Sequence, residues 1–360
     1  MSAAGQARRH RLARRRSPPA ARDETGLTWR TLLQYARAAK DFTATPSVSL
    51  PATSFDKLTA ADRSGLPPAE MFELADAGQM AFRRYGPAGE GAALVLLIHG
   101  SGGHAGQLHG LARAIAGQGL GEVYALDLRG HGSSPGRRGH AVRHHDQLCA
   151  DVCEFLHFMH RSRPAAPVVI GGHSAGGGLA LRVLRSPAGR RLSGCFFLAP
   201  YLGLGSATIR PLFGGWVGVR AKRLRALALA NVLGIRWFNG STTVAFNLGP
   251  LGHDPAYAPS WSFNTMLAFG PGLWSATSPP VDPRIPVLSI CGDRDECFFG
   301  DAYPDAFRIL APHAELASVE CCGHWDILVD PGALTIVTGW LRRVLGDRAG
   351  PAARTARADH

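Results

Sequence analysis

The segment Gly172–Gly176 has the sequence GHSAG, in which Ser174 stands two positions from a glycine on each side. An apolar run, Val168–Ile170, precedes this segment, and a helical pattern, Leu179–Leu184, follows it. A serine on a sharp strand-to-helix turn exposes its hydroxyl, and the strained turn requires small flanking residues. We therefore predict that Ser174 is a nucleophile; a glycine-rich packing turn is the alternative.

A nucleophilic serine needs a base, and the base needs an acid that orients it. Of the fifteen histidines, His324 is the one that combines a small residue before it with a place after the last predicted strand. Two aspartates, Asp293 and Asp295, follow the preceding strand, Val287–Ile290. The G-x-x-D spacing favours Asp295 as the acid and leaves Asp293 as the alternative. The order serine, aspartate, histidine along the chain is typical of a nucleophile on such a turn.

Acyl transfer places negative charge on an oxygen in the transition state, and backbone N–H groups can stabilise that charge. The turn after the nucleophile aims the N–H of Ala175 at this oxygen. A second glycine-rich loop, His99–His104, has the sequence HGSGGH and follows the predicted strand Ala93–Ile98. We expect this loop to supply the N–H of Ser101 as the second donor, and we expect His99 to be structural rather than catalytic.

Six short apolar runs are typical of strands that are buried on both faces, and helical patterns separate most of them. The clearest helical pattern is Gln147–His160, and the alternation from Met71 to Phe82 predicts a hairpin before the first run. Strands that alternate with helices predict an α/β fold with a doubly wound, mostly parallel sheet. The six runs are Ala93–Ile98, Val123–Leu126, Val168–Ile170, Cys195–Leu198, Val287–Ile290 and Leu316–Val319.

About 80 residues in the second half of the chain carry no clear strand pattern, so we predict that they form an inserted helical lid. Near the N-terminus, one amphipathic pattern, Leu27–Lys40, predicts a helix within a basic and otherwise flexible segment. The predicted organisation is an N-terminal tail and connector (1–65), an α/β core (66–200 plus 281–346), the lid (201–280) and a C-terminal tail (347–360).

The net charge of +12 is concentrated at the two ends of the chain. Residues 1–16 carry +6 and residues 342–360 carry +3, which leaves +3 for the rest. We expect no nucleic-acid partner, because no folded face holds this charge. The basic tails are expected to be solvated; contact with an anionic membrane or with nucleic acid is the alternative. The first residues lack the apolar stretch of a secretory signal, and no run approaches the roughly 18 apolar residues of a membrane span. We expect a cytoplasmic protein that is at most peripheral to a membrane.

The seven cysteines include no CxxC pair and do not indicate a disulfide framework. A zinc site built from Cys291, Cys297 and Cys321 would have the wrong spacing for a finger or a ribbon, so reduced thiols are expected. Acyl transfer through a serine needs neither a metal nor an organic cofactor, and we expect none.

Three further features resemble one known family. The loop His99–His104 resembles an HGxGxH oxyanion loop, Asp127–Ser134 (DLRGHGSS) resembles a D-x-R-G-x-G-x-S loop, and the helix Gln147–His160 resembles the segment that leads to the nucleophile. Together with the GHSAG turn and the acid, they make the chain similar to the monoacylglycerol lipase and lysophospholipase branch of the α/β-hydrolases, the serine aminopeptidase S33-like group. The resemblance covers about residues 70–200 and 280–345. It implies the α/β-hydrolase fold.

The predicted lid is rich in aromatic residues and in positive charge. Its aromatic side chains could line an apolar channel for an acyl chain, or they could simply pack the lid. The lid contains six basic residues and a single acidic residue, Asp254. An aminopeptidase needs carboxylates to hold the ammonium group of its substrate, so this composition counts against peptide substrates. The aromatic residues considered are Phe213, Trp216, Trp237, Phe238, Phe246, Trp261, Phe263, Phe269 and Trp274, and the basic ones are Arg210, Arg220, Lys222, Arg223, Arg225 and Arg236.

The sequence therefore predicts a serine hydrolase that cleaves carboxylic esters, with small-molecule or lipid-like acyl esters of the monoacylglycerol or lysophospholipid type as substrates. The alternatives are a short-chain esterase, a thioesterase or an amidase of the same fold, and a non-catalytic binding protein that has kept the fold. Haloalkane dehalogenation and epoxide opening are disfavoured, because both need a carboxylate where Ser174 stands.

Overall fold

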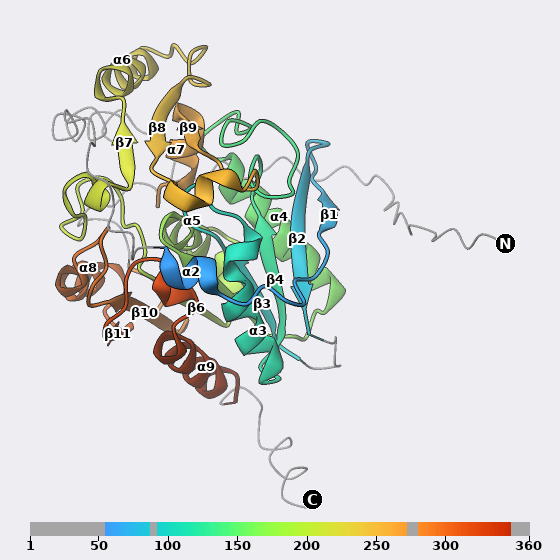
Figure 1. The fold of residues 1–360 in the computed structure, drawn as a ribbon. Helices are drawn as coiled ribbons and strands as arrows, with labels where there is room; N and C mark the ends of the chain where they lie inside the picture. Colours follow the sequence, from blue (N-terminus) through green and yellow to red (C-terminus); the bar gives the residue numbers. More distant parts are fainter. Residues whose placement is uncertain (1–54, 87–91, 272–279, 347–360) are drawn as a thin grey trace, which may run out of the picture.

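The computed structural model describes residues 55–86, 92–271 and 280–346, and a large central sheet organises it (Figure 1). The predicted helix Leu27–Lys40 lies outside the described residues. The strands of the central sheet are β1 (Glu70–Glu73), β2 (Gln79–Tyr85), β3 (Leu94–Ile98), β4 (Glu122–Asp127), β5 (Val168–His173), β6 (Gly194–Leu198), β10 (Val287–Gly292) and β11 (Glu315–Val319). Their order in the sheet is β1-β2-β4-β3-β5-β6-β10-β11.

The sheet is mostly parallel, as predicted. β1 pairs with β2 and β2 pairs with β4 in antiparallel fashion, and every other pair of neighbours is parallel. In β3, β4, β5, β6 and β10 every residue is buried, because helices cover both faces of the sheet. This double burial explains why these strands are continuous apolar runs, whereas the edge strand β1 alternates. The predicted hairpin, β1 and β2, is confirmed.

The helices are distributed over the two faces of the sheet. They are α3 (His109–Gly117), α4 (Gln147–Ser162), α5 (Ala175–Leu184), α8 (Tyr303–Leu310) and α9 (Pro331–Gly346). Right-handed crossovers place α3 on one face and α4, α5 and α8 on the other. Consistent with this, α3 contacts α9, and α4 contacts α5. Among the described helices, none combines the length and the apolar character that crossing a bilayer requires.

Between β6 and β10 lies the inserted segment, residues 201–280, whose described part sits at one end of the central sheet (Figure 1). We predicted helices there, and the structure contains strands as well. An antiparallel three-stranded sheet has the order β7-β8-β9, and its strands are only three to five residues long, too short to give a periodic signal. The elements are β7 (Val217–Val219), α6 (Ala221–Val232), β8 (Thr242–Phe246), β9 (Ser260–Ser262) and α7 (Phe263–Phe269), with 3-10 turns at Pro211–Gly215 and Gly249–His253.

A short helix near the start of the described chain, α2 (Asp56–Ala60), packs on the core. Phe55 is buried and its ring lies 4.7 Å from that of Trp325, beside the predicted base. Lys57 forms ion pairs with Asp326 and Asp330 in the same loop region. Residues in the stretch that we assigned to a tail and connector therefore support the loop that carries His324.

Candidate active site

Ser174 occupies the turn between β5 and α5 with φ 52° and ψ −121°, a backbone conformation that residues other than glycine rarely adopt. The two flanking glycines are required by space. A Cβ at Gly172 would lie 2.4 Å from the carbonyl oxygen of Gly176, and a Cβ at Gly176 would lie 2.3 Å from the carbonyl oxygen of His99. The turn thus has the strained geometry that the GHSAG pattern predicts, and its strain holds the Ser174 hydroxyl at the end of β5.

The two residues that we predicted as backbone donors lie close to Ser174. Ala175 is the first residue of α5, so its N–H has no acceptor within the helix. Ser101 follows β3 on a loop that approaches Ser174 closely, because a Cβ at Gly100 would lie 3.1 Å from the Cβ of Ser174. Ser101, Ser174 and Ala175 all line the same cavity.

Both ring nitrogens of His99 make hydrogen bonds with the backbone. Its Nε2 accepts the backbone N–H of Leu128 at 3.2 Å, so the ring proton is on Nδ1, which donates to the carbonyl oxygen of Gly100 at 2.8 Å. Burial lowers the pKa of His99, and the ring is fully buried. Both ring nitrogens therefore hold loops in place.

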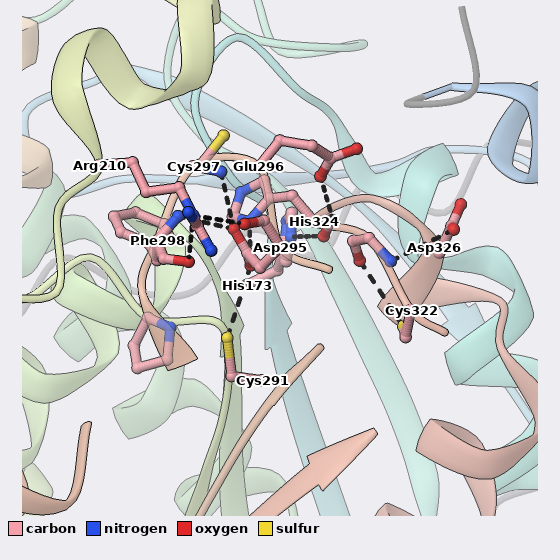
Figure 2. A network of polar contacts seen from close by, with 12 residues as sticks. His173, Arg210, Cys291, Asp295, Glu296, Cys297, Phe298, Cys322, His324 and Asp326 are labelled. Carbon is pink, nitrogen blue, oxygen red and sulfur yellow. Dashed lines mark hydrogen bonds and ion pairs between the residues drawn. The ribbon is translucent and has the colours of Figure 1, made fainter. Parts of the chain in front are cut away.

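The side chains of His324 and Asp295 form a buried pair (Figure 2). His324 Nδ1 lies 2.8 Å from Asp295 Oδ2, and each residue is only 1% exposed. Asp293, the alternative acid, is exposed and accepts the backbone N–H of Cys322 instead. Of the two aspartates, Asp295 is the one in contact with the imidazole.

The second oxygen of Asp295 is held by the backbone. Oδ1 accepts the N–H of Cys297 at 2.8 Å and that of Phe298 at 2.7 Å, and the Cys291 thiol donates to Oδ2 at 3.6 Å. Hydrogen bonds of this kind fix the orientation of a carboxyl group. These contacts hold the side chain of Asp295 in place beside His324 (Figure 2).

Two further contacts fix the loop that carries His324. The carboxylate of Glu296 accepts the backbone N–H of His324 at 2.7 Å. His173, the residue before Ser174, has its Nε2 3.0 Å from the carbonyl oxygen of His324. Burial lowers the pKa of His173 well below its usual value, and His324 nearby adds to this effect. The neutral ring of His173 then donates a hydrogen bond to that carbonyl oxygen, which joins the turn that carries Ser174 to the loop that carries His324.

A cavity of about 650 Å³, counting the space at its open mouth, lies above Ser174. Within the described part of the chain its lining contains no charged side chain. Five of the lid aromatics that we considered line it: Phe213, Trp216, Phe246, Trp261 and Phe269. Of the others, Phe263 is buried in a separate cluster with α6, Trp237 and Phe238 are exposed, and Trp274 lies outside the described residues.

Trp216 connects the inserted segment to the loop after β3. Its Nε1–H donates to the Ser101 hydroxyl at 3.1 Å, and its ring stacks on Phe246. This contact joins residues 115 positions apart and sequence reasoning missed it, as it missed His173 and Glu296. Their place in the sequence could have pointed to His173 and Glu296, since each stands next to a predicted site residue.

The Asp127–Ser134 loop stabilises the neighbouring loop that follows β3. Asp127 accepts the N–H of Ala105 at 2.6 Å and that of Ser133 at 2.8 Å, which joins the loop after β3 to the loop after β4. Arg129 forms a two-point ion pair with the buried Asp151 on α4. These residues hold the site in place and do not line the cavity.

One group of side chains could hold a metal ion. Among the described residues, the ligand atoms of Asp295, Cys297 and His324 lie within 4.8 Å of one another. The Asp295 oxygens already accept N–H groups, and burial raises the pKa of the Cys297 thiol well above its usual value, which keeps it protonated. The group is therefore satisfied as a hydrogen-bonded network. Of the seven cysteines, Cys321 is exposed.

The mostly parallel sheet with a strained serine turn after its central strand defines an α/β-hydrolase. The model of the family described as "Serine aminopeptidase, S33" matches residues 89–325. The chain belongs to this family.

The chain is also similar to several monoglyceride lipases. It is 39% identical over 105 residues to the monoglyceride lipase of Homo sapiens, a match that covers 29% of this chain and 34% of that protein. It is 40% identical over 86 residues to the monoacylglycerol lipase of Mycolicibacterium smegmatis, covering 24% of this chain and 30% of that one. The chain thus spans about a third of the length of these curated relatives.

Among solved structures, a soluble variant of the monoglyceride lipase from Saccharomyces cerevisiae, in complex with a substrate analog, has a TM-score of 0.65. Its sequence is 18% identical, and the match covers 79% of this chain and 98% of that one. This likeness shows the α/β-hydrolase fold.

Proposed function

We propose that this chain is a serine hydrolase that cleaves carboxylic esters through an acyl-enzyme. His324 takes the proton of the Ser174 hydroxyl as the oxygen attacks the ester carbonyl, and Asp295 keeps the imidazole in the correct tautomer. The N–H groups of Ser101 and Ala175 stabilise the oxyanion. The intermediate collapses, and His324 gives its proton to the departing alcohol. Water then attacks the acyl group, with His324 as base, and releases the acid.

The observation that carries this proposal is the buried contact between His324 and Asp295, which stands beside a strained serine turn. His324 Nδ1 is 2.8 Å from Asp295, so that Nδ1 carries a proton and Nε2 is free to act as a base. The contact between His173 and His324 joins this pair to the residue before Ser174. A packing turn would need none of these contacts, which speaks against a non-catalytic protein that kept only the fold.

The cavity supports a lipid-like acyl ester as the substrate, of the monoacylglycerol or lysophospholipid type. Its lining is aromatic and aliphatic apart from hydroxyl and thiol groups, and an acyl chain could replace water there. Within the described residues, no carboxylate lines it that could pair with the ammonium group of a peptide substrate. A short-chain esterase, thioesterase or amidase is the alternative that a small usable pocket would favour.

Labelling with a fluorophosphonate tests the proposal, because the probe reacts only with an activated serine. We expect stoichiometric labelling of the full chain and none of the Ser174→Ala variant, with circular dichroism as a check of folding. The Ser133→Ala variant is the matched control, since Ser133 lies outside the cavity lining and must leave labelling unchanged. A full chain that is folded and resists the probe would instead support a binding protein.

A further inference from the structure

The first part of the inserted segment lies against the loop after β10, which carries Asp295. Ile209 and Phe298 form an antiparallel β-bridge outside the strands of the two sheets. Beside this bridge, Arg210 donates its backbone N–H to the carbonyl of Cys297 at 3.0 Å. The segment that supplies much of the cavity wall is thus joined directly to the loop that carries Asp295.

The side chain of Arg210 adds a second connection to this loop (Figure 2). Its Nε–H donates to the carbonyl oxygen of Asp295 at 2.8 Å and to that of Phe298 at 3.0 Å. Asp295 and Phe298 are both buried, and within the described residues no other donor reaches either carbonyl. Buried carbonyl groups in native proteins are paired almost without exception. Arg210 therefore provides the partner of two backbone groups that would otherwise be buried and unpaired.

The guanidinium group of Arg210 is itself held in place. Its Cζ lies 4.3 Å from the centroid of the Phe299 ring, a distance at which the cation is attracted to the aromatic face. Arg210 is half-buried, and in the described part of the chain it is not among the residues that line the cavity. Its side chain thus contacts the loop and not a substrate above Ser174, so any effect on the reaction passes through the loop.

Phe298 connects Arg210 to both members of the buried pair. Its backbone N–H donates to Asp295 Oδ1 at 2.7 Å, and its ring packs on the imidazole of His324 with centroids 5.2 Å apart. Arg210 holds the carbonyl of the same residue. A shift of the loop would therefore move the carboxylate of Asp295 and the ring beside His324 together.

We propose that Arg210 is a positioning residue, which holds the loop after β10 so that Asp295 meets His324 in the geometry that the reaction needs. The inference rests on the proposed function, because it assigns Arg210 to the orientation of the same acid. The hydrogen-bond donor is the essential part of the side chain, since Nε is the atom that contacts both carbonyls. The inserted segment then contributes to the chemical step as well as to the wall of the cavity.

Two substitutions at position 210 separate the donor from the rest of the side chain. Glutamine has an amide N–H group at the same bond position as the arginine Nε, whereas methionine has a methyl group there. Arg210→Met should lower kcat for a soluble p-nitrophenyl ester at least about tenfold and change KM less than about threefold, because a small misplacement of the acid slows the chemical step. Arg210→Gln keeps the donor and should retain kcat within about threefold of the full chain.

A double-mutant cycle tests whether Arg210 acts through Asp295. Asp295→Asn alone removes the acid, so Arg210→Met added to it should cost less than about threefold further in kcat. A residue that supported the fold in general would instead multiply the two losses. Arg220→Met is the matched control, since Arg220 is exposed at the start of α6, and it should leave kcat unchanged.

Three kinetic results would overturn the inference: a folded Arg210→Met variant with full kcat, equal losses in Arg210→Met and Arg210→Gln, or losses from Arg210→Met and Asp295→Asn that multiply. Circular dichroism and urea unfolding check each variant. An Arg210→Met variant that does not fold would also overturn it, because Arg210 would then support the fold as a whole. A full chain that neither hydrolyses the ester nor reacts with the fluorophosphonate would contradict the proposed function instead, so the two failures are distinguishable.

Discussion

The imidazole of His173 donates a hydrogen bond to the backbone carbonyl of His324 across 3.0 Å, and so the turn that carries Ser174 is tied directly to the loop that carries the base. The two rings also pack, with centroids 4.8 Å apart. Residues 151 positions apart in the chain are held together by this contact. It gives His173 a role in positioning, although His173 takes no part in proton transfer in the proposed reaction.

His173→Phe should therefore lower kcat more than it raises KM. The phenyl ring keeps much of the packing but removes the donor, and the carbonyl of His324 loses its buried partner at a cost of about 1–3 kcal/mol in unfolding free energy. A small shift of the base can reduce turnover by up to about 100-fold. Steady-state kinetics with a soluble ester, together with urea unfolding, measure both effects. A variant with full kcat would show that the contact is dispensable.

Asp295→Asn and Asp293→Asn separate the two candidate acids. Asp295→Asn should reduce kcat by roughly 10³ to 10⁴, because the amide favours the wrong imidazole tautomer. Asp293→Asn should cost less than about tenfold, since Asp293 is exposed and contacts a backbone N–H away from the imidazole. The reverse order of effects would contradict the assignment of Asp295 as the acid.

Gly176→Ala should destabilise the fold by about 1–3 kcal/mol or more, because the added methyl group would meet the backbone of His99 and Ile98 within 2.5 Å. Gly339→Ala is the matched control. Gly339 lies inside α9 and nothing lies within 4 Å of an added Cβ, so alanine should stabilise the protein by roughly 0.5–1 kcal/mol. Urea unfolding of the two variants provides the measurement. Equal effects would mean that the serine turn is not sterically constrained.

Acyl chain length is the variable that tests the cavity. Each methylene that leaves water contributes about 0.8 kcal/mol, so kcat/KM should rise severalfold for every two carbons and stop rising where the cavity ends. A panel of p-nitrophenyl esters and monoacylglycerols, used below their critical micelle concentrations, measures this dependence. Activity that peaks at two to four carbons and then falls would favour a short-chain esterase and leave the serine mechanism untouched.

Much of the core could be predicted from sequence because its signals are local. Strands buried on both faces give continuous apolar runs. The turn at Ser174 has room only for glycine at positions 172 and 176, so it gives a recognisable glycine spacing. The spacing of the sequence favoured Asp295 over Asp293, but only the three-dimensional structure shows the contact between Asp295 and His324.

The remaining features depend on contacts between distant parts of the chain. β7 and β9 are three residues long and exist through pairing with β8, so no periodic pattern marks them. Phe55 precedes the predicted core, yet it is buried against the rings of Trp216 and Trp325. The bond from Trp216 to Ser101 likewise spans 115 positions. Pairings of this kind leave no trace in the local sequence.

The central claim is that Ser174 carries the acyl group during turnover. The most direct measurement is rapid quenching of the full chain with a p-nitrophenyl ester, followed by peptide mass spectrometry. The account predicts a burst of p-nitrophenol of about one equivalent per chain wherever release of the acid is the slower step, with the acyl mass on the peptide that contains Ser174 and a Ser174→Ala variant that shows neither. An acyl group on another residue, or substantial turnover by the folded Ser174→Ala variant, would contradict it.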